Sequence, residues 1–207
     1  FIFLWDPIRN SIFVSLMASI AAALCALPVA AMVVRYPGFL SRVVERVSFT
    51  GYALPGIVVA LAMVFFGIGW AQPLYQTIWL LLLAYVILFL PAALGAIRTS
   101  FLQLSPNQEE AARGLGKTSL QTMISVTIPQ LRFGIVTGAV LVFLVTLKEL
   151  PATLLLAPLE FSTLATKIWS ASEEAFFAQA ALPAITLVII SCVPMAFLIL
   201  KDDRTRN

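Results

Sequence analysis

The chain has 207 residues, of which 61% are hydrophobic and 11% are charged, and its net charge is +3. A soluble domain carries about a quarter charged residues, so this composition excludes a surface built for water and predicts a protein of the lipid bilayer. The charges lie in short segments between apolar runs, which argues against a basic face for nucleic acid.

Reactive side chains are scarce. The sequence has no histidine, the commonest metal ligand and general base. Cys25 and Cys192 both lie inside apolar runs, where we expect small buried side chains, without a disulfide or a zinc site. No nucleophile–base pair is recognisable. We therefore predict that the chain is not an enzyme, has no catalytic residue and holds no metal or cofactor.

Five apolar runs approach the roughly 20 residues that a helix needs to cross a bilayer. In chain order they cover residues 11–34, 48–66, 77–97, 134–156 and 181–200, the fourth being interrupted by Lys148 and Glu149. The runs contain prolines at 28, 55, 91, 183 and 194, which transmembrane bundles tolerate as kinks. The pattern predicts an all-α, polytopic transmembrane helix bundle in which residues 1–207 form a single domain.

The basic residues predict the orientation of these spans. They concentrate in alternate connections, at Arg35, Arg42 and Arg46, then Arg98, Arg113, Lys117 and Arg132, and finally Lys201, Arg204 and Arg206. The positive-inside rule places these segments, and the carboxyl end, in the cytoplasm. The tryptophans at 5, 70, 79 and 169 fall at the opposite ends of the spans, as an outer aromatic belt would.

The connection over residues 98–133 is the most polar part of the chain. Ser105 and Pro106 mark a helix start, and Gly114 or Gly116 its end. Thr118 with Gln121 marks a second helix start, and Pro129 is expected to stop that helix. The reversal at Gly116 predicts a positive φ there. The result is a cytoplasmic helix–turn–helix, either a solvated connector or a docking element for a partner.

This loop resembles the EAA signature of permeases in binding-protein-dependent (type I) ABC importers. The family pattern reads E-A-A, three residues, G, nine residues, I-x-L-P. Here Glu110, Ala111 and Ala112 are followed at the same spacing by Gly116 and by Val126-Thr127-Ile128-Pro129, with conservative departures at 126 and 128. The resemblance implies that Glu110, Ala111, Ala112, Gly116 and Pro129 couple the chain to a separate cytoplasmic ATPase.

The resemblance extends to residues 147–158 and 162–166, which are similar to the ferric-iron branch of these permeases. It implies import of ferric iron across the bacterial inner membrane, delivered by an extracytoplasmic binding protein. Members of that branch are often tandem fusions of two permease halves. We expect this chain to be one half, the second, with its partner half either fused or separate.

Lys148 and Glu149 follow an apolar run, and charges at such depth usually serve a function. Neighbouring helical residues point about 100° apart, so we expect one to face the translocation path and the other a neighbouring helix. The alternative is that both lie at the outer interface, with Lys148 extending to water.

Three other functions remain open. The nearest is a permease of the same type for sulfate, molybdate, thiamine or a phosphonate. A secondary transporter would work without an ATPase, and an intramembrane enzyme has the least support because the sequence contains no catalytic constellation. Co-purification of a nucleotide-hydrolysing subunit would separate the importer from the last two.

Overall fold

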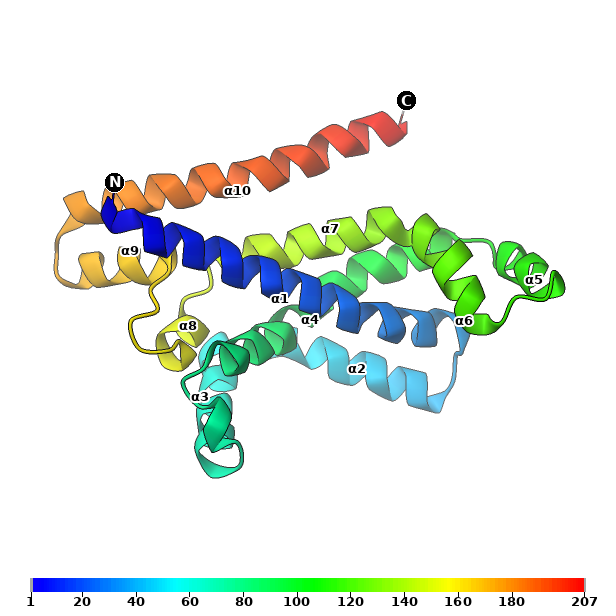
Figure 1. Ribbon diagram of the computed structural model, residues 1–207, viewed down its shortest axis with the longest axis horizontal. Coiled ribbons are helices and arrows are strands. Elements are labelled where there is room, and N and C mark those ends of the chain that lie inside the picture. Colours follow the sequence, from blue (N-terminus) through cyan, green and yellow to red (C-terminus); the bar gives the residue numbers. More distant parts are fainter. Residues whose placement is uncertain (1, 207) are drawn as a thin grey trace.

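A computed structural model describes the backbone of residues 2–206 (Figure 1). The predicted all-α class is confirmed, since these residues form helices and no strand. In chain order the helices are α1 (Ile2–Arg35), α2 (Phe39–Ala53), α3 (Gly56–Gly69), α4 (Ile78–Gln103), α5 (Pro106–Gly114), α6 (Ser119–Thr122), α7 (Ile128–Leu147), α8 (Pro151–Leu156), α9 (Leu164–Glu173) and α10 (Phe177–Arg206). A short 3₁₀ turn, Gln72–Leu74, precedes α4, and a π-helical turn, Met123–Thr127, joins α6 to α7.

Helices α1, α4 and α7 pack against one another and form the centre of the bundle. On α1, alanines 18, 22, 26 and 30 recur at four-residue intervals, and each is fully buried. On α7, a Cβ added at Gly138 would lie 3.1 Å from the Ala93 Cα of α4, and one at Gly134 would collide with the Ser100 side chain. Small residues at these contacts let the helix backbones approach closely, as in other membrane bundles.

Four helices are long and apolar enough to cross a membrane: Leu4–Arg35, Ile78–Gln103, Ser119–Leu147 and Phe177–Leu200. A fifth span results if the bent pair α2 and α3 counts as one. The runs expected at 11–34, 77–97 and 181–200 lie within α1, α4 and α10, which continue through prolines 28, 91, 183 and 194.

The second expected span, 48–66, is not one straight helix. Its two halves belong to α2 and α3, which meet at a bend of 109°. Leu54 between them is extended, with φ −99° and ψ 134°. A proline disfavours helical geometry in the residue before it, so Pro55 breaks the helix where we expected only a kink.

The fourth expected run, 134–156, is divided between two helices, with the interruption at the charged pair where the sequence indicated it. Helix α7 ends at Leu147, and the chain starts again as the short helix α8 at Pro151. The ring of Pro151 would clash with the Leu147 carbonyl in a continuous helix, and it has no N–H to offer that carbonyl. The interruption therefore falls at Lys148–Leu150.

The bundle has two distinct ends (Figure 1). Helices α5 and α6 lie at one end, called the loop end below, and α9 lies with the amino terminus at the other, the far end. At the far end, the Leu164 N–H donates to the Ser11 Oγ (2.8 Å) and the Asn10 amide to the Ser162 carbonyl (3.1 Å). These bonds fix the start of α9 to α1.

Helix α10 runs along the outside of the bundle and contacts mainly α9 and, less, α7 (Figure 1). Only 6% of its apolar window is buried, against 56% in α4. Cys192 on α10 and Cys25 on α1 are exposed, so the expectation that they are buried was wrong. In a membrane protein an apolar side chain can face lipid or another subunit, and apolar sequence alone does not imply burial.

Candidate functional site

The connection between α4 and α7 is a compact helical hairpin. Helix α5 begins with Pro106 in its first turn, and its last carbonyls accept from the N–H groups of Leu115, Gly116 and Lys117. Gly116 has φ +87°, the conformation predicted for the reversal. Thr118 starts α6 with the predicted capping box: its Oγ1 accepts from the Gln121 N–H (3.3 Å), and the Gln121 amide oxygen accepts from the Thr118 N–H (3.0 Å).

Pro129 does not stop this second helix as predicted. Residues from Ser119 to Leu147 form one continuous 29-residue helical rod, in which Pro129 follows the π-helical turn Met123–Thr127. The wider π turn shifts the carbonyl that a proline ring would otherwise strike. The loop hairpin is thus built directly onto the α7 span.

Two neighbouring glutamates on α5 face different surroundings. Glu110 is exposed, as are Ala111 and Gly116, whereas Ala112 is buried. The tip of the hairpin also exposes large apolar side chains: Leu115 at 86%, Leu120 at 70% and Ile124 at 59%. Exposed leucines on a polar loop are typical of a surface that a partner covers.

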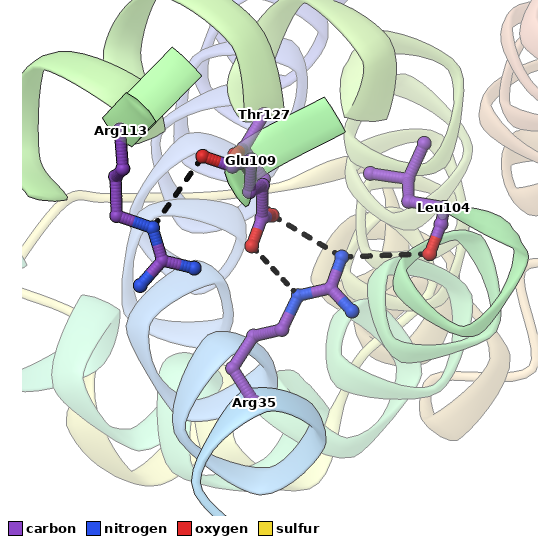
Figure 2. Close-up of polar contacts among 5 residues, drawn as sticks. All are labelled: Arg35, Leu104, Glu109, Arg113 and Thr127. Carbon is purple, nitrogen blue, oxygen red and sulfur yellow. Dashed lines mark hydrogen bonds and ion pairs between the residues drawn. The ribbon is translucent and has the colours of Figure 1, made fainter. Parts of the chain in front are cut away.

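Glu109 turns inward and forms a partly buried ion pair with Arg35, the last residue of α1 (Figure 2). The Arg35 Nε lies 3.1 Å from Glu109 Oε2, and Nη2 donates to Oε1 at 3.2 Å. The side chains are only 15% and 14% exposed. Because 74 residues separate the partners, no local sequence pattern reveals this contact.

The same cluster joins two further elements (Figure 2). The Thr127 hydroxyl at the end of the π turn donates to Glu109 Oε1 at 3.0 Å, and Arg35 Nη2 reaches the Leu104 carbonyl after α4 at 3.5 Å. The Arg35 guanidinium also lies 5.8 Å from the centre of the Phe101 ring. The contacts of Arg35, Glu109, Thr127 and the Leu104 carbonyl are called the Arg35 clamp below. It joins α5 to the ends of α1 and α4 and to the start of α7.

The other two predicted site residues, Lys148 and Glu149, lie at the break between α7 and α8 and face different elements. Glu149 Oε1 accepts from the Ala152 N–H at 3.2 Å and would lie 3.1 Å from a Cβ at Gly56, where α3 begins. The two helix breaks, after α2 and after α7, therefore adjoin at Glu149.

Lys148 points elsewhere, into a cleft of about 660 Å³ between α7 and α10. The cleft is lined along α10 by residues between Leu187 and Ile199. Lys148 itself directly follows Leu147, the last residue of α7.

Within the described residues, no group of three or more His, Cys, Asp or Glu side chains is placed to hold a metal ion.

A family model described as "Binding-protein-dependent transport system inner membrane component" matches residues 11–206. The chain belongs to this family. The membership confirms the resemblance to importer permeases and makes the chain a multi-pass component of the inner membrane. The relatives below are transport permeases, so this permease is not an enzyme.

The Fe(3+)-transport system permease protein FbpB 2 of Haemophilus influenzae is 36% identical over 189 residues, which are 91% of this permease and 37% of that relative. This permease therefore spans little more than a third of that relative's length. PhnV of Salmonella typhimurium, named for 2-aminoethylphosphonate transport, is 27% identical over 192 residues, which are 92% of this permease and 72% of PhnV. The molybdate/tungstate permease protein WtpB of Pyrococcus furiosus is 24% identical over 152 residues, 73% of this permease and 60% of WtpB.

Two solved structures share the fold. An amino acid ABC transporter superposes with a TM-score of 0.68 at 21% sequence identity, over 96% of this permease and 92% of that chain. The inward-facing MetNI methionine ABC transporter superposes with a TM-score of 0.72 at 16% identity, over 98% and 95%.

Proposed function

We propose that this permease forms the membrane pathway of an ATP-driven importer and that its loop hairpin docks on a separate ATPase subunit. The observation that carries the proposal is the hairpin itself: a compact element with a fixed reversal, a capped second helix and exposed Leu115 and Leu120 at its tip. A passive connector needs neither a fixed reversal nor apolar side chains in water. Family membership supports the further partners, namely an extracytoplasmic binding protein and a second permease half, fused or separate.

The coupling residues have distinct roles in this proposal. Glu110 offers a carboxylate to a basic surface of the ATPase, and the exposed Ala111 leaves room for close approach. Ala112 is buried, so its small side chain instead lets α5 pack closely against its own chain. Gly116 fixes the reversal that presents the tip. Pro129 belongs to the junction through which the hairpin continues into α7. When ATP draws two ATPase subunits together, each hairpin moves with its subunit, and the spans change between outward and inward openings.

Lys148 and Glu149 are proposed to line the translocation path. Their support is geometric, because Glu149 lies where two broken helices adjoin and Lys148 faces an open cleft. Broken helices within a membrane bundle commonly mark transport sites, since irregular backbone is tolerated where it lines a cavity.

Ferric iron is the proposed substrate, on the strength of the 36% identity to the Haemophilus influenzae iron permease. The likeness to PhnV favours a phosphonate as the second candidate. A strain deleted for this gene should lose uptake of radioactive ferric iron and keep uptake of 2-aminoethylphosphonate and of molybdate. If the strain takes up iron normally and loses uptake of either anion, that anion and not ferric iron is the substrate.

Docking is tested by co-purification of the ATPase with tagged permease. Serine at both Leu115 and Leu120 should reduce the ATPase retained by about tenfold, the size expected for two exposed contact residues at a docking site. Leu159→Ser is the matched control, because Leu159 is 80% exposed outside the loop hairpin. Equal retention by all three proteins would argue against docking through this tip.

The proposal places the loop end and the carboxyl end in the cytoplasm, following the basic connections. Single cysteines at Gln72, Gln108 and Asn207 test it in a background with Cys25 and Cys192 replaced by alanine. An impermeant maleimide added to intact cells should label position 72 and leave 108 and 207 unlabelled. Labelling of position 108 from outside would show that the orientation is opposite to the proposed one.

A further inference from the structure

The Arg35 clamp is not explained by docking alone. Glu109 and Glu110 are adjacent on α5, yet Glu109 turns its carboxylate inward while Glu110 remains exposed. Successive residues on a helix point about 100° apart. A short helix can therefore present one carboxylate to a partner and hold its own bundle with the next.

Stability is a weak reason for this pair. Removing two charges from water offsets much of their mutual attraction, so an apolar pair of similar volume often stabilises a fold equally well. An arginine–carboxylate contact adds defined direction, because its two parallel interactions fix the angle between the groups. The clamp is better suited to holding α5 at one orientation than to strengthening the fold.

The Glu109 carboxylate is also the point where several spans meet. It contacts Arg35 at the end of α1 and Thr127 directly before α7, and Arg35 in turn reaches the Leu104 carbonyl after α4. Helices α1, α4 and α7 are the centre of the bundle. Helix α5 is thus connected at one site to the ends of all three central helices.

We propose that the Arg35–Glu109 pair, with Thr127, is the joint that transmits movement of the loop hairpin to the spans, Arg35 and Glu109 acting as positioning residues. The inference rests on the proposed function, because it takes the ATPase to be the source of the movement. Glu110 and the hairpin tip hold the ATPase, and Glu109 passes its motion inward. Loss of the joint leaves a docked ATPase whose ATP hydrolysis no longer drives transport.

The test compares variants of the permease assembled with its ATPase and binding protein in proteoliposomes. The transported probe is whichever of ferric iron, 2-aminoethylphosphonate or molybdate the uptake assay selects. Glu109→Gln and Arg35→Gln should keep the ATPase bound and hydrolysing, while transport per ATP falls at least about fivefold, the lower range of coupling between distant sites. The neighbouring variant Glu110→Gln should instead lower the amount of ATPase retained, which separates loss of docking from loss of transmission.

Three further variants separate a joint from a merely structural contact. The exchange Arg35→Glu with Glu109→Arg restores opposite charges. It should recover at least about half of the wild-type transport per ATP, since coupling depends on the pair and not on either residue alone. Thr127→Val removes the hydrogen bond to Glu109 without leaving a charge unpaired and should lower transport per ATP. Thr127→Ser keeps the hydroxyl and should not lower it. If Arg35→Gln and Glu109→Gln fail to insert into the membrane, the comparison of Thr127→Val with Thr127→Ser alone decides the test.

The proposed joint is overturned if Glu109→Gln keeps the wild-type transport per ATP. Where the glutamine variants fail to insert, the same result in Thr127→Val overturns it. So does an exchanged pair no better than the single variants. Failure of the proposed function has a different signature, because wild-type permease would then retain no ATPase at all.

Discussion

Both ends of helix α7 carry a nearby proline, and the chain responds in opposite ways. At the loop end, Pro129 follows a π turn and the helical rod continues from Ser119 to Leu147. At the other end, Pro151 follows a break at which the helix stops and Lys148 and Glu149 turn to different neighbours.

The difference shows what each end is suited to do. A continuous rod passes a displacement along its length, and the Arg35 clamp fixes the rod to α5 (Figure 2). A break lets neighbouring segments move relative to one another and leaves backbone and charges free to meet a substrate. In the proposed function, the continuous end of α7 near Pro129, called the rigid end below, receives the movement of the ATPase. The end interrupted at Lys148 and Glu149, called the broken end below, lines the translocation path.

The rigid end is most easily disrupted at Gly116. Gly116→Val places a β-branched residue at φ +87°, which costs roughly 1 kcal/mol or more. We expect uptake to fall about tenfold while the protein remains in the membrane, as a barrier change of about 1.4 kcal/mol would give. Uptake and immunoblotting of membranes measure both quantities.

Gly114→Val is its control, because a Cβ at Gly114 meets nothing within 4 Å. Equal loss of uptake in the two variants would mean that helix α5, and not the reversal, is sensitive to valine.

Glu149→Gln tests the broken end with a smaller expected effect. Glutamine keeps the Oε1 that accepts from the Ala152 N–H and removes only the charge. We expect uptake to fall about fivefold at normal abundance, since a carboxylate inside a membrane bundle is costly to keep without a role in transport. The exposed Glu174→Gln is the control, and normal uptake by both variants would remove Glu149 from the path.

Tyr85→Phe tests what holds the broken end in place. The Tyr85 hydroxyl is buried and hydrogen-bonded to Thr153 of α8, whose own hydroxyl donates to the Glu149 carbonyl at 2.7 Å. Losing this bond should cost about 1 kcal/mol and lower the melting temperature in detergent by roughly 2–4 °C. Tyr52→Phe, at a tyrosine that is 61% exposed, should melt like the wild type; a similar shift in both would place the effect outside the α4–α8 contact.

Pro129→Ala should have the smallest effect. Alanine restores an N–H where the helix already continues, and the Thr127–Glu109 bond still holds the π turn in place. We expect uptake within about twofold of wild type, the range of most exposed substitutions. A much larger loss would show that the proline itself sets the direction of the rod.

Local signals in the sequence predicted local structure well. The positive φ of Gly116 and the Thr118–Gln121 capping box each depend on a few neighbouring residues, and both are present. Family membership was likewise predictable, because the loop motif is contiguous. The exposure of Glu110 agrees with its predicted role, although the role itself stays a prediction.

Long-range geometry was not predictable in the same way. The effect of a proline depends on its surroundings: Pro28 is absorbed within α1, Pro55 breaks a helix, and Pro129 is accommodated by a π turn. The sequence offers the same residue in each case. The Arg35 clamp escaped prediction because its partners are far apart in the chain, and a terminal arginine of a span is normally explained by the positive-inside rule alone.

The loose attachment of α10 has a consequence for biosynthesis. A long apolar helix satisfies its own backbone hydrogen bonds and is stable in lipid before it meets any neighbour. Since little of the surface of α10 is buried, the core of α1, α4 and α7 can be completed while α10 still diffuses in the bilayer. Its docking is then a separable step of assembly.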